Sequence, residues 1–163
     1  AETSALLTSE YLGYLDDDKV VVFEQDIRTG GAIDSGVSMI LNWRVAINGV
    51  INSVGIQGKP DDHSNWRTLG EAAQDLGVAI ATTTTYRFRL EIAGANRHSG
   101  SDYLVRWFIN GVLRRSATIA FSGDKFQASL YLENPLAGPG GGYSMTADPV
   151  RVRWTHRATP DNL

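Results

Sequence analysis

The sequence predicts an all-β protein built as a two-sheet antiparallel β-sandwich, and three observations carry that prediction. Apolar and polar residues alternate with a period of two along several segments, which is typical of strands buried on one face. Glycine is frequent, at 17 of 163 residues, and favours turns between these segments. Only residues 68–76 have a helix-like pattern. Half-buried strands must cover their apolar faces with a second sheet.

The predicted strands follow one another with turn residues between them. The segment 86–92 shows the alternation most clearly, because its aromatic and aliphatic residues oppose two arginines and a glutamate. Asn48-Gly49 and Asn110-Gly111 are hairpin signals, since both central residues of a type I′ turn need positive φ. We expect strands at 20–28, 38–45, 51–57, 86–92, 103–110, 126–133 and 150–157.

Length and composition limit the organisation and the partners. We expect a single domain over residues 1–163, with its core at about 10–157 and a frayed tail at 158–163. The formal net charge of -3, without a clustered basic stripe, gives no reason to expect nucleic-acid binding. No apolar run reaches the roughly 18 residues of a membrane helix, so membrane insertion is not expected. Cysteine is absent, which excludes disulfides and thiolate metal sites.

The first residue bears on the compartment. The chain begins at Ala1 rather than at a methionine, as the mature form of an exported protein would. A trimmed chain would begin in the same way. We favour export and expect an extracellular or cell-surface location.

The order of the segments resembles a known family. Residues 85–92 form an alternating strand that starts with Thr-Tyr, residues 105–111 end in a hairpin signal, and a short strand after Asp148 closes the chain. This arrangement, over roughly residues 10–157, resembles the laminin-G-like form of the concanavalin A-like lectin and glucanase superfamily. The resemblance implies a jelly roll of two curved sheets, whose concave face often binds sugar chains. Members bind, cleave or act as spacers, so the fold does not decide the function.

Glu24 and Asp26 lie on one face of the first long strand, where their carboxylates could form a catalytic pair. Such neighbours are roughly 6.5–7 Å apart at the backbone, and retaining glycosidases need carboxyl groups about 5–5.5 Å apart. The glucanases of the resembling family carry Glu-x-Asp-x-x-Glu, but here Thr29 stands where the second glutamate would be. We favour the alternative, a polar strand face whose acids pair with arginines across strands.

A concave sheet lined by outward polar side chains would suit sugar hydroxyls or uronate carboxylates. Polysaccharide lyases of the resembling fold use such a face, with a tyrosine and a histidine near the scissile bond, although their strand motifs are absent here. The alternative is a solvated ladder of ion pairs, each contributing little to stability. The candidate residues for a ligand-binding face are Glu24, Asp26, Arg44, Arg89 and Tyr131.

The segment 61–67 reads as a polar loop that contains a tryptophan. Trp66 could stack on a sugar ring while His63, Asn65 and Arg67 hydrogen-bond to its hydroxyls. The segment weakly resembles the His-x-Asn-Pro-Arg strand of galectins, with Trp66 in place of the proline. The alternative is that Trp66 packs against the edge of the sandwich.

Asp16 and Asp18 belong to an acidic turn before the first long strand and could bind calcium. Adjacent aspartates in a turn are usually only solvated, so calcium binding stays open. The three histidines are scattered without zinc-binding spacing, and no other cofactor is indicated.

These features favour a secreted or surface carbohydrate-binding or adhesive module without catalytic activity. A structural subunit of a surface assembly or appendage is one alternative, and it would imply a homo-oligomer. The other is a polysaccharide hydrolase or lyase that uses Glu24 or Asp26 with Tyr131 or Glu133 in a concave groove.

Overall fold

The structure of the chain is a computed structural model. It describes residues 5–8, 19–31, 41–47, 52–59, 63–94, 102–120, 129–133 and 145–156. These residues form twelve β-strands and no helix, so they contain no helix that could cross a membrane.

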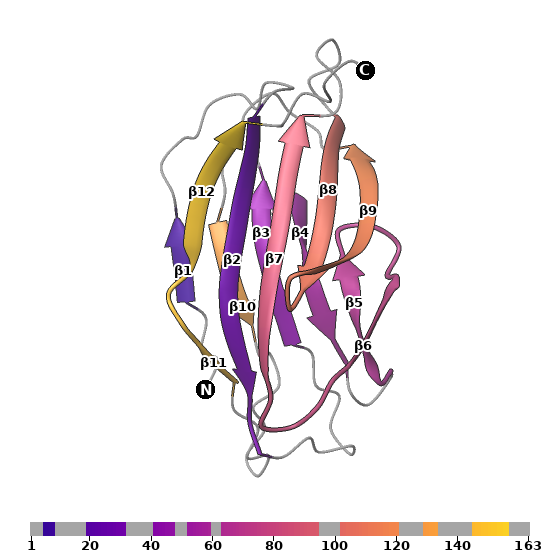
Figure 1. The fold of residues 1–163 in the computed structure, drawn as a ribbon, viewed down its shortest axis with the longest axis vertical. Coiled ribbons are helices and arrows are strands. Elements are labelled where there is room, and N and C mark those ends of the chain that lie inside the picture. The colour runs from indigo at the N-terminus through magenta and orange to yellow at the C-terminus, as the bar shows by residue number, and fades with distance from the viewer. Residues whose placement is uncertain are drawn as a thin grey trace.

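The strands pair into two antiparallel sheets that pack face to face (Figure 1). The back sheet has the order β1-β10-β3-β4-β5-β6, and the front sheet has the order β11-β2-β7-β8-β9, with β12 also paired to β2. The back sheet consists of β1 (Ala5–Thr8), β3 (Leu41–Ile47), β4 (Asn52–Gly58), β5 (Asn65–Leu69), β6 (Asp75–Ala79) and β10 (Ser129–Glu133). The front sheet consists of β2 (Lys19–Thr29), β7 (Thr85–Gly94), β8 (Asp102–Ile109), β9 (Val112–Ala120), β11 (Met145–Ala147) and β12 (Arg151–His156).

Three buried tryptophans fill the space between the sheets. Trp43, Trp66 and Trp107 are each 1% exposed or less. The ring of Trp66 packs edge-on against Tyr86 and Phe88, with ring centroids 5.2 and 5.0 Å apart. Edge-to-face pairs of this kind contribute about 0.5–1.5 kcal/mol beyond the burial of their area. The apolar residues of the alternating segments therefore meet in one core, as the sandwich prediction requires.

Two indole N–H groups join the sheets through hydrogen bonds. Trp43 Nε1 in the back sheet donates to Gln25 Oε1 in the front sheet, and Trp107 Nε1 in the front sheet donates to the Gly55 carbonyl in the back sheet, both at 2.8 Å. The Gln25 amide nitrogen donates to the carbonyl of Asp148 at 2.6 Å. Buried polar groups are costly unless paired, so these bonds favour one relative position of the sheets.

The helix-like pattern of residues 68–76 does not form a helix, because this segment contains the end of β5, a turn at 70–74 and the start of β6. Gly70 has φ of +102°, a conformation that side-chain-bearing residues rarely adopt, and a Cβ there would lie 2.5 Å from the Ser53 carbonyl oxygen. The backbone N–H of Gln74 donates to Thr68 Oγ1 at 3.0 Å and closes the turn. The hairpin signal at Asn110-Gly111 is confirmed, with φ of 54° and 79°, whereas Asn48-Gly49 lies outside the described residues.

The two indoles at positions 43 and 66 offer a matched test of the hydrogen bond between the sheets. Trp66 Nε1 has no hydrogen-bond partner among the described residues, unlike Trp43 Nε1. Trp43→Phe should lower the free energy of unfolding more than Trp66→Phe, by about 1–3 kcal/mol, because it leaves the buried Gln25 oxygen unsatisfied. Urea denaturation of both variants measures the difference, and equal losses would contradict this role of the bond.

Candidate functional site

The predicted site residues lie on two opposite faces of the sandwich. Antiparallel partners point to the same side of a sheet, so the strand register assigns each residue to a face. Glu24, Asp26 and Arg89 belong to β2 and β7 of the front sheet, whereas Arg44, Asn65, Arg67 and Tyr131 belong to β3, β5 and β10 of the back sheet.

The pairing of Glu24 or Asp26 with Tyr131 or Glu133 in one groove is therefore wrong. The two acids are in β2, Tyr131 and Glu133 are in β10, and these strands belong to different sheets. Alternation assigns a residue to one side of its own strand, but it does not say in which sheet that strand lies.

The front face is a ladder of ion pairs. Arg87 grips Asp26 with two hydrogen bonds, from Nε to Oδ1 at 2.8 Å and from a terminal nitrogen to Oδ2 at 3.0 Å. These bonds hold the pKa of Asp26 below its usual 3.8, although partial burial opposes the effect. A carboxyl group with a lowered pKa is ionised at neutral pH and makes a poor general acid.

Two other acids of the front face, Glu91 and Glu24, also have arginine partners. Glu91 pairs with Arg89, and an Arg106 nitrogen lies 3.6 Å from its second oxygen. Glu24 lies 3.8 Å from Arg151. The front face thus matches the ion-pair ladder, the alternative to a ligand-binding surface for these residues.

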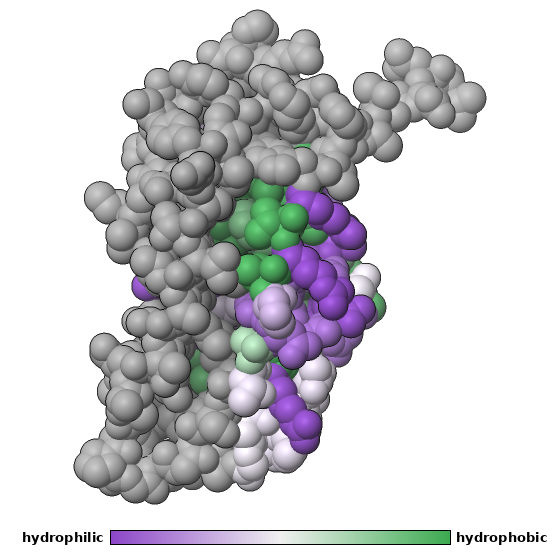
Figure 2. Space-filling model, turned by 90° about the vertical axis from the view of Figure 1, so that its left-hand side faces the viewer, coloured by the Kyte–Doolittle hydropathy of each residue, from purple (hydrophilic) through white to green (hydrophobic). Residues whose placement is uncertain are grey.

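One end of the front face is apolar. Val20, Val22 and Ala93 form a small buried cluster, and Leu104 packs against it. Figure 2 shows hydrophobic residues beside hydrophilic ones on one flank of the described part of the molecule. The ion-pair ladder therefore covers only part of the front sheet.

The back face carries arginine and amide side chains. Arg44 in β3 lies opposite Gly55 in β4, and Gln57 in β4 lies between Asn42 and Arg67 on the neighbouring strands. The Gln57 amide donates to Asn42 Oδ1 at 3.0 Å, which fixes the orientation of both side chains. Asn42 is buried, whereas Arg44, Gln57 and Arg67 are half-buried and carry N–H groups that can donate to hydroxyl and carboxylate oxygens.

Gly55 adds no side chain to the back face. A Cβ there would lie 2.0 Å from the carbonyl oxygen of Trp43, so the close contact of β3 and β4 requires glycine. β3 lies between β10 and β4, and Tyr131 in β10 is the partner of Arg44 on the side away from β4. The register thus puts Tyr131, Arg44 and Gly55 in one row across the back sheet.

The predicted loop 61–67 is partly strand, and it divides its residues between the core and the surface. Asn65 donates to both oxygens of Asp75 at 3.0 and 3.1 Å. The pKa of Asp75 is lowered mainly by the backbone N–H of Gly77, next by Asn65, and also by the positive charges of Arg67 and His63. His63, Asn65 and Arg67 are therefore gathered around Asp75 at one end of the back sheet.

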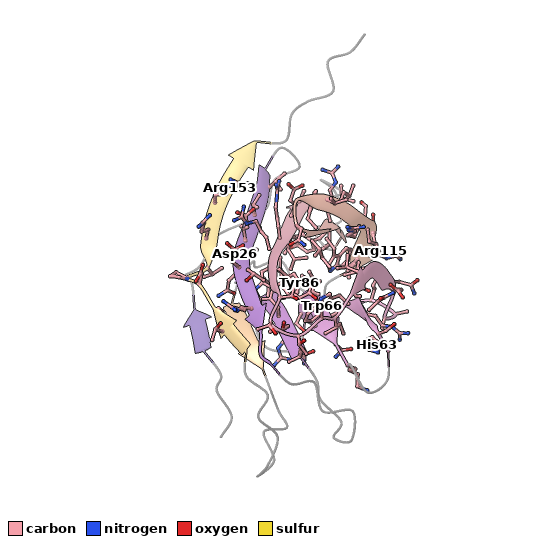
Figure 3. The ribbon with its side chains drawn as sticks, turned by 60° about the horizontal axis from the view of Figure 1, so that its bottom comes forward. Asp26, His63, Trp66, Tyr86, Arg115 and Arg153 are labelled. Carbon is pink, nitrogen blue, oxygen red and sulfur yellow. The ribbon has the colours of Figure 1, made fainter. Side chains whose placement is uncertain are left out.

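The expectation that Trp66 stacks on a sugar ring is wrong. Its indole is 1% exposed and faces the core, where Figure 3 shows it beside Tyr86. Trp66 alternates with two half-buried residues along β5, so the strand turns it inward. The alternative interpretation, that Trp66 packs inside the sandwich, is closer to the structure.

Sequence reasoning singled out neither Gln57 nor Asp75. The alternation in 51–57 was the available signal for Gln57, since Ile56 before it is fully buried. Nothing local marks Asp75, which reaches Asn65 only because β6 pairs with β5. Asp16 and Asp18 lie outside the described residues, among which no three histidine or acidic side chains gather as a metal site.

Comparison with known proteins decides the fold. No protein-family model and no curated protein matches the chain. Alginate lyase AlgAT5 of Polysaccharide Lyase family 7 is 9% identical, with a TM-score of 0.53, over 85% of this chain and 60% of that one. Alginate lyase PA1167 of Pseudomonas aeruginosa is 14% identical, with a TM-score of 0.52, over 88% and 68%. The Emp46p carbohydrate recognition domain is 14% identical, with a TM-score of 0.50, over 82% and 71%.

The fold is a concanavalin A-like jelly roll. Identities this low show the fold alone, and the chain spans only 60% of the length of AlgAT5. Within the jelly roll, the front face satisfies its acids with its own arginines. The back face directs Arg44, Gln57 and Arg67 outward from three neighbouring strands and is a candidate ligand site.

The ion pair of Asp26 predicts a pH-dependent stability. Its lowered pKa means that the ionised carboxylate stabilises the fold above pH 3.8, and this contribution is lost as the pH falls through the lowered pKa. The wild type should be more stable than Asp26→Asn at neutral pH, and the two should converge in acid. Urea denaturation over a pH series measures this, and a constant difference would exclude the pair as its cause.

Proposed function

We propose that the chain is a carbohydrate-binding module that holds an acidic polysaccharide on the outer face of the back sheet. The observation that carries the proposal is the shared face of Arg44, Arg67, Asn42 and Gln57 on three adjacent strands. A guanidinium group binds a carboxylate through two parallel hydrogen bonds, and amides bind hydroxyl groups.

The spacing of the arginines suits a polymer. Arg44 and Arg67 lie on strands separated by β4 and in rows two residues apart, so their backbones are roughly 9.5 Å apart across the sheet and roughly 7 Å apart along it. Each guanidinium could contact a carboxylate on a different sugar unit of one chain. Strands of a packed sheet hold such groups more firmly than loops do.

The structural neighbours support carbohydrate as the class of ligand. They include proteins named as alginate lyases and one named as a carbohydrate recognition domain. A polysaccharide ligand would place the module outside the cell or at its surface, where such material is met.

A polysaccharide lyase is the second candidate function, favoured by the position of Tyr131. Elimination from a uronate needs a group that neutralises the carboxylate and a residue that transfers a proton. Arg44 could serve the first purpose, and Tyr131 lies opposite it in the register. Release of an unsaturated product from polyuronates, followed by ultraviolet absorbance, separates this function from binding alone. A structural subunit stays a prediction, to be tested by the oligomeric state in solution.

Binding to the back face should depend on its arginines. Arg44→Gln and Arg67→Gln should each weaken the binding of polyuronate oligosaccharides about tenfold, because each removes a charge-assisted hydrogen bond. Isothermal titration calorimetry measures the change, and added salt should weaken wild-type binding.

Arg114→Gln is the matched control for these variants. Arg114 is an exposed arginine in β9 of the front sheet, so its loss changes the net charge equally but leaves the back face intact. Equal weakening by all three variants would reduce the effect to net charge. Absence of wild-type binding to any acidic polysaccharide of a broad panel would refute the proposal.

A further inference from the structure

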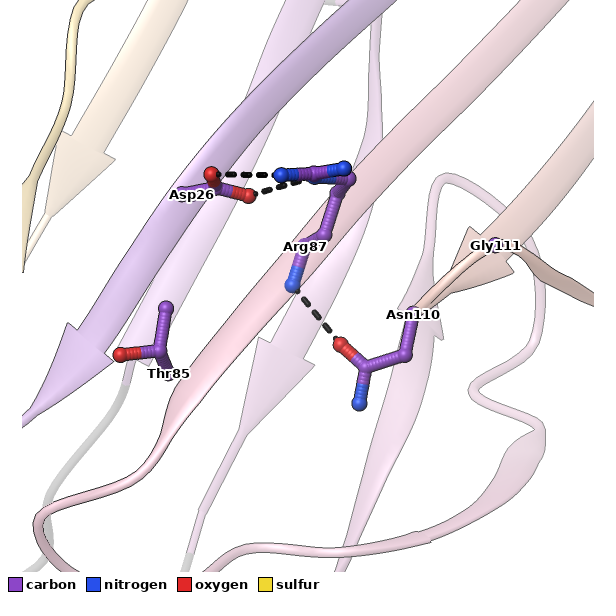
Figure 4. Close-up of a pocket in the computed structure, with 5 residues that line it drawn as sticks. All are labelled: Asp26, Thr85, Arg87, Asn110 and Gly111. Atoms are coloured by element: carbon purple, nitrogen blue, oxygen red, sulfur yellow. Dashed lines mark hydrogen bonds and ion pairs between the residues drawn. The ribbon is translucent and has the colours of Figure 1, made fainter.

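The front sheet carries a pocket that the proposed polysaccharide face does not use. It has a volume of about 360 Å³ and is lined by Asp26, Thr85, Arg87, Asn110 and Gly111 (Figure 4). Ligand pockets typically measure about 300–1,000 Å³, so the pocket has room for a small molecule. It lies where the β8–β9 hairpin turns beside β7, on the sheet opposite to Arg44 and Arg67.

The hairpin fixes the side chain of Asn110. Its φ of 54° is left-handed, a conformation that asparagine tolerates better than most residues. Its Oδ1 accepts a hydrogen bond from the Arg87 backbone N–H at 2.9 Å, and its own backbone N–H donates to the Arg87 carbonyl at 2.9 Å. Because Oδ1 is engaged, the orientation of the Nδ2 amide group is set, and Figure 4 shows it turned away from the Arg87 backbone.

Two donors of the pocket are left for a ligand. Neither Asn110 Nδ2 nor Thr85 Oγ1 has a hydrogen-bond partner among the described residues; Thr85 begins β7, and Asn110 lies in the turn between β8 and β9. The Thr85 hydroxyl both donates and accepts, and the amide adds two N–H donors. A ligand hydroxyl can satisfy either group.

The two charged groups that line the pocket cancel, and Arg28 lies opposite Thr85 in the register, outside the lining. Arg87 uses two of its nitrogens to bind Asp26, so the two ionised groups form one neutral unit. An anion would compete with Asp26 for the guanidinium, and a cation would compete with Arg87 for the carboxylate. In the row beyond Arg87, the guanidinium of Arg89 lies over the ring of Phe108, 4.7 Å from its centroid. Recognition in the pocket would therefore depend on hydrogen bonds to neutral groups.

We propose that this pocket is a second carbohydrate site, which takes a neutral sugar residue through its hydroxyl groups. Thr85 and Asn110 would donate to the sugar oxygens, and the outer atoms of the Asp26–Arg87 pair would accept from and donate to its hydroxyls. This site does not depend on the proposed polysaccharide face, because it lies on the other sheet and selects uncharged rather than acidic sugars.

Nuclear magnetic resonance titration with methyl glycosides of glucose, galactose and mannose tests the pocket. At least one glycoside should shift the backbone amide signals of Thr85, Arg87, Asn110 and Gly111, with a millimolar dissociation constant of about 1–10 mM. Thr85→Val should weaken this binding about tenfold, because it removes one hydroxyl and keeps the shape. Thr118→Val, an exposed threonine in β9 that does not line the pocket, should leave it unchanged.

Asn110→Asp gives a second, independent variant. It keeps an oxygen for the Arg87 N–H and replaces the NH₂ donor by an acceptor, so it should also weaken binding while the hairpin stays folded. Amide shifts confined to Gly55 and Gln57, or none with any glycoside, would overturn the proposal. Shifts at the pocket without any polyuronate binding would leave this site standing and remove the polysaccharide face.

Discussion

The contact between the two sheets is the interaction on which the rest of the structure depends. Trp43 and Trp107 each belong to one sheet and donate a buried hydrogen bond to the other, to Gln25 and to the Gly55 carbonyl. Burial of the apolar side chains drives the sheets together without setting a direction, whereas these bonds have one geometry. Once the sheets are fixed on each other, each outer face presents a set of polar groups at defined positions.

The core also separates the chemistry of the two faces. On the front face Asp26, Glu24 and Glu91 have arginine partners, so these three acids are paired within the protein. Surface pairs of this kind contribute little stability. The arginines at outward positions of β2, β7, β8 and β12 outnumber these three acids, so the described front face keeps a net positive charge. On the back face, Arg44 in β3 and Arg67 in β5 lie on either side of β4, which carries the amide of Gln57. The two proposed sites therefore lie on opposite sheets and differ in their polar groups.

The two candidate sites depend on backbone features as much as on side chains. Gly55 keeps β3 and β4 in close contact beneath the back face, since a Cβ would overlap the Trp43 carbonyl. Asn110 adopts a left-handed conformation at the hairpin, and its side chain is fixed by the Arg87 backbone. Both positions fix the backbone at a candidate site without a flexible loop, which would lower the ordering cost of binding.

The sequence by itself determined that the chain is all-β, where β2 and β7 lie, and that Asn110-Gly111 turns a hairpin, because periodicity and turn conformation are local properties. The pairing of strands was decided by the tertiary structure alone. Only the assembled sandwich separates Asp26 from Tyr131, turns Trp66 into the core and brings Asp75 beside Asn65. Such contacts depend on which strands become neighbours, and that follows from burying every apolar face at once.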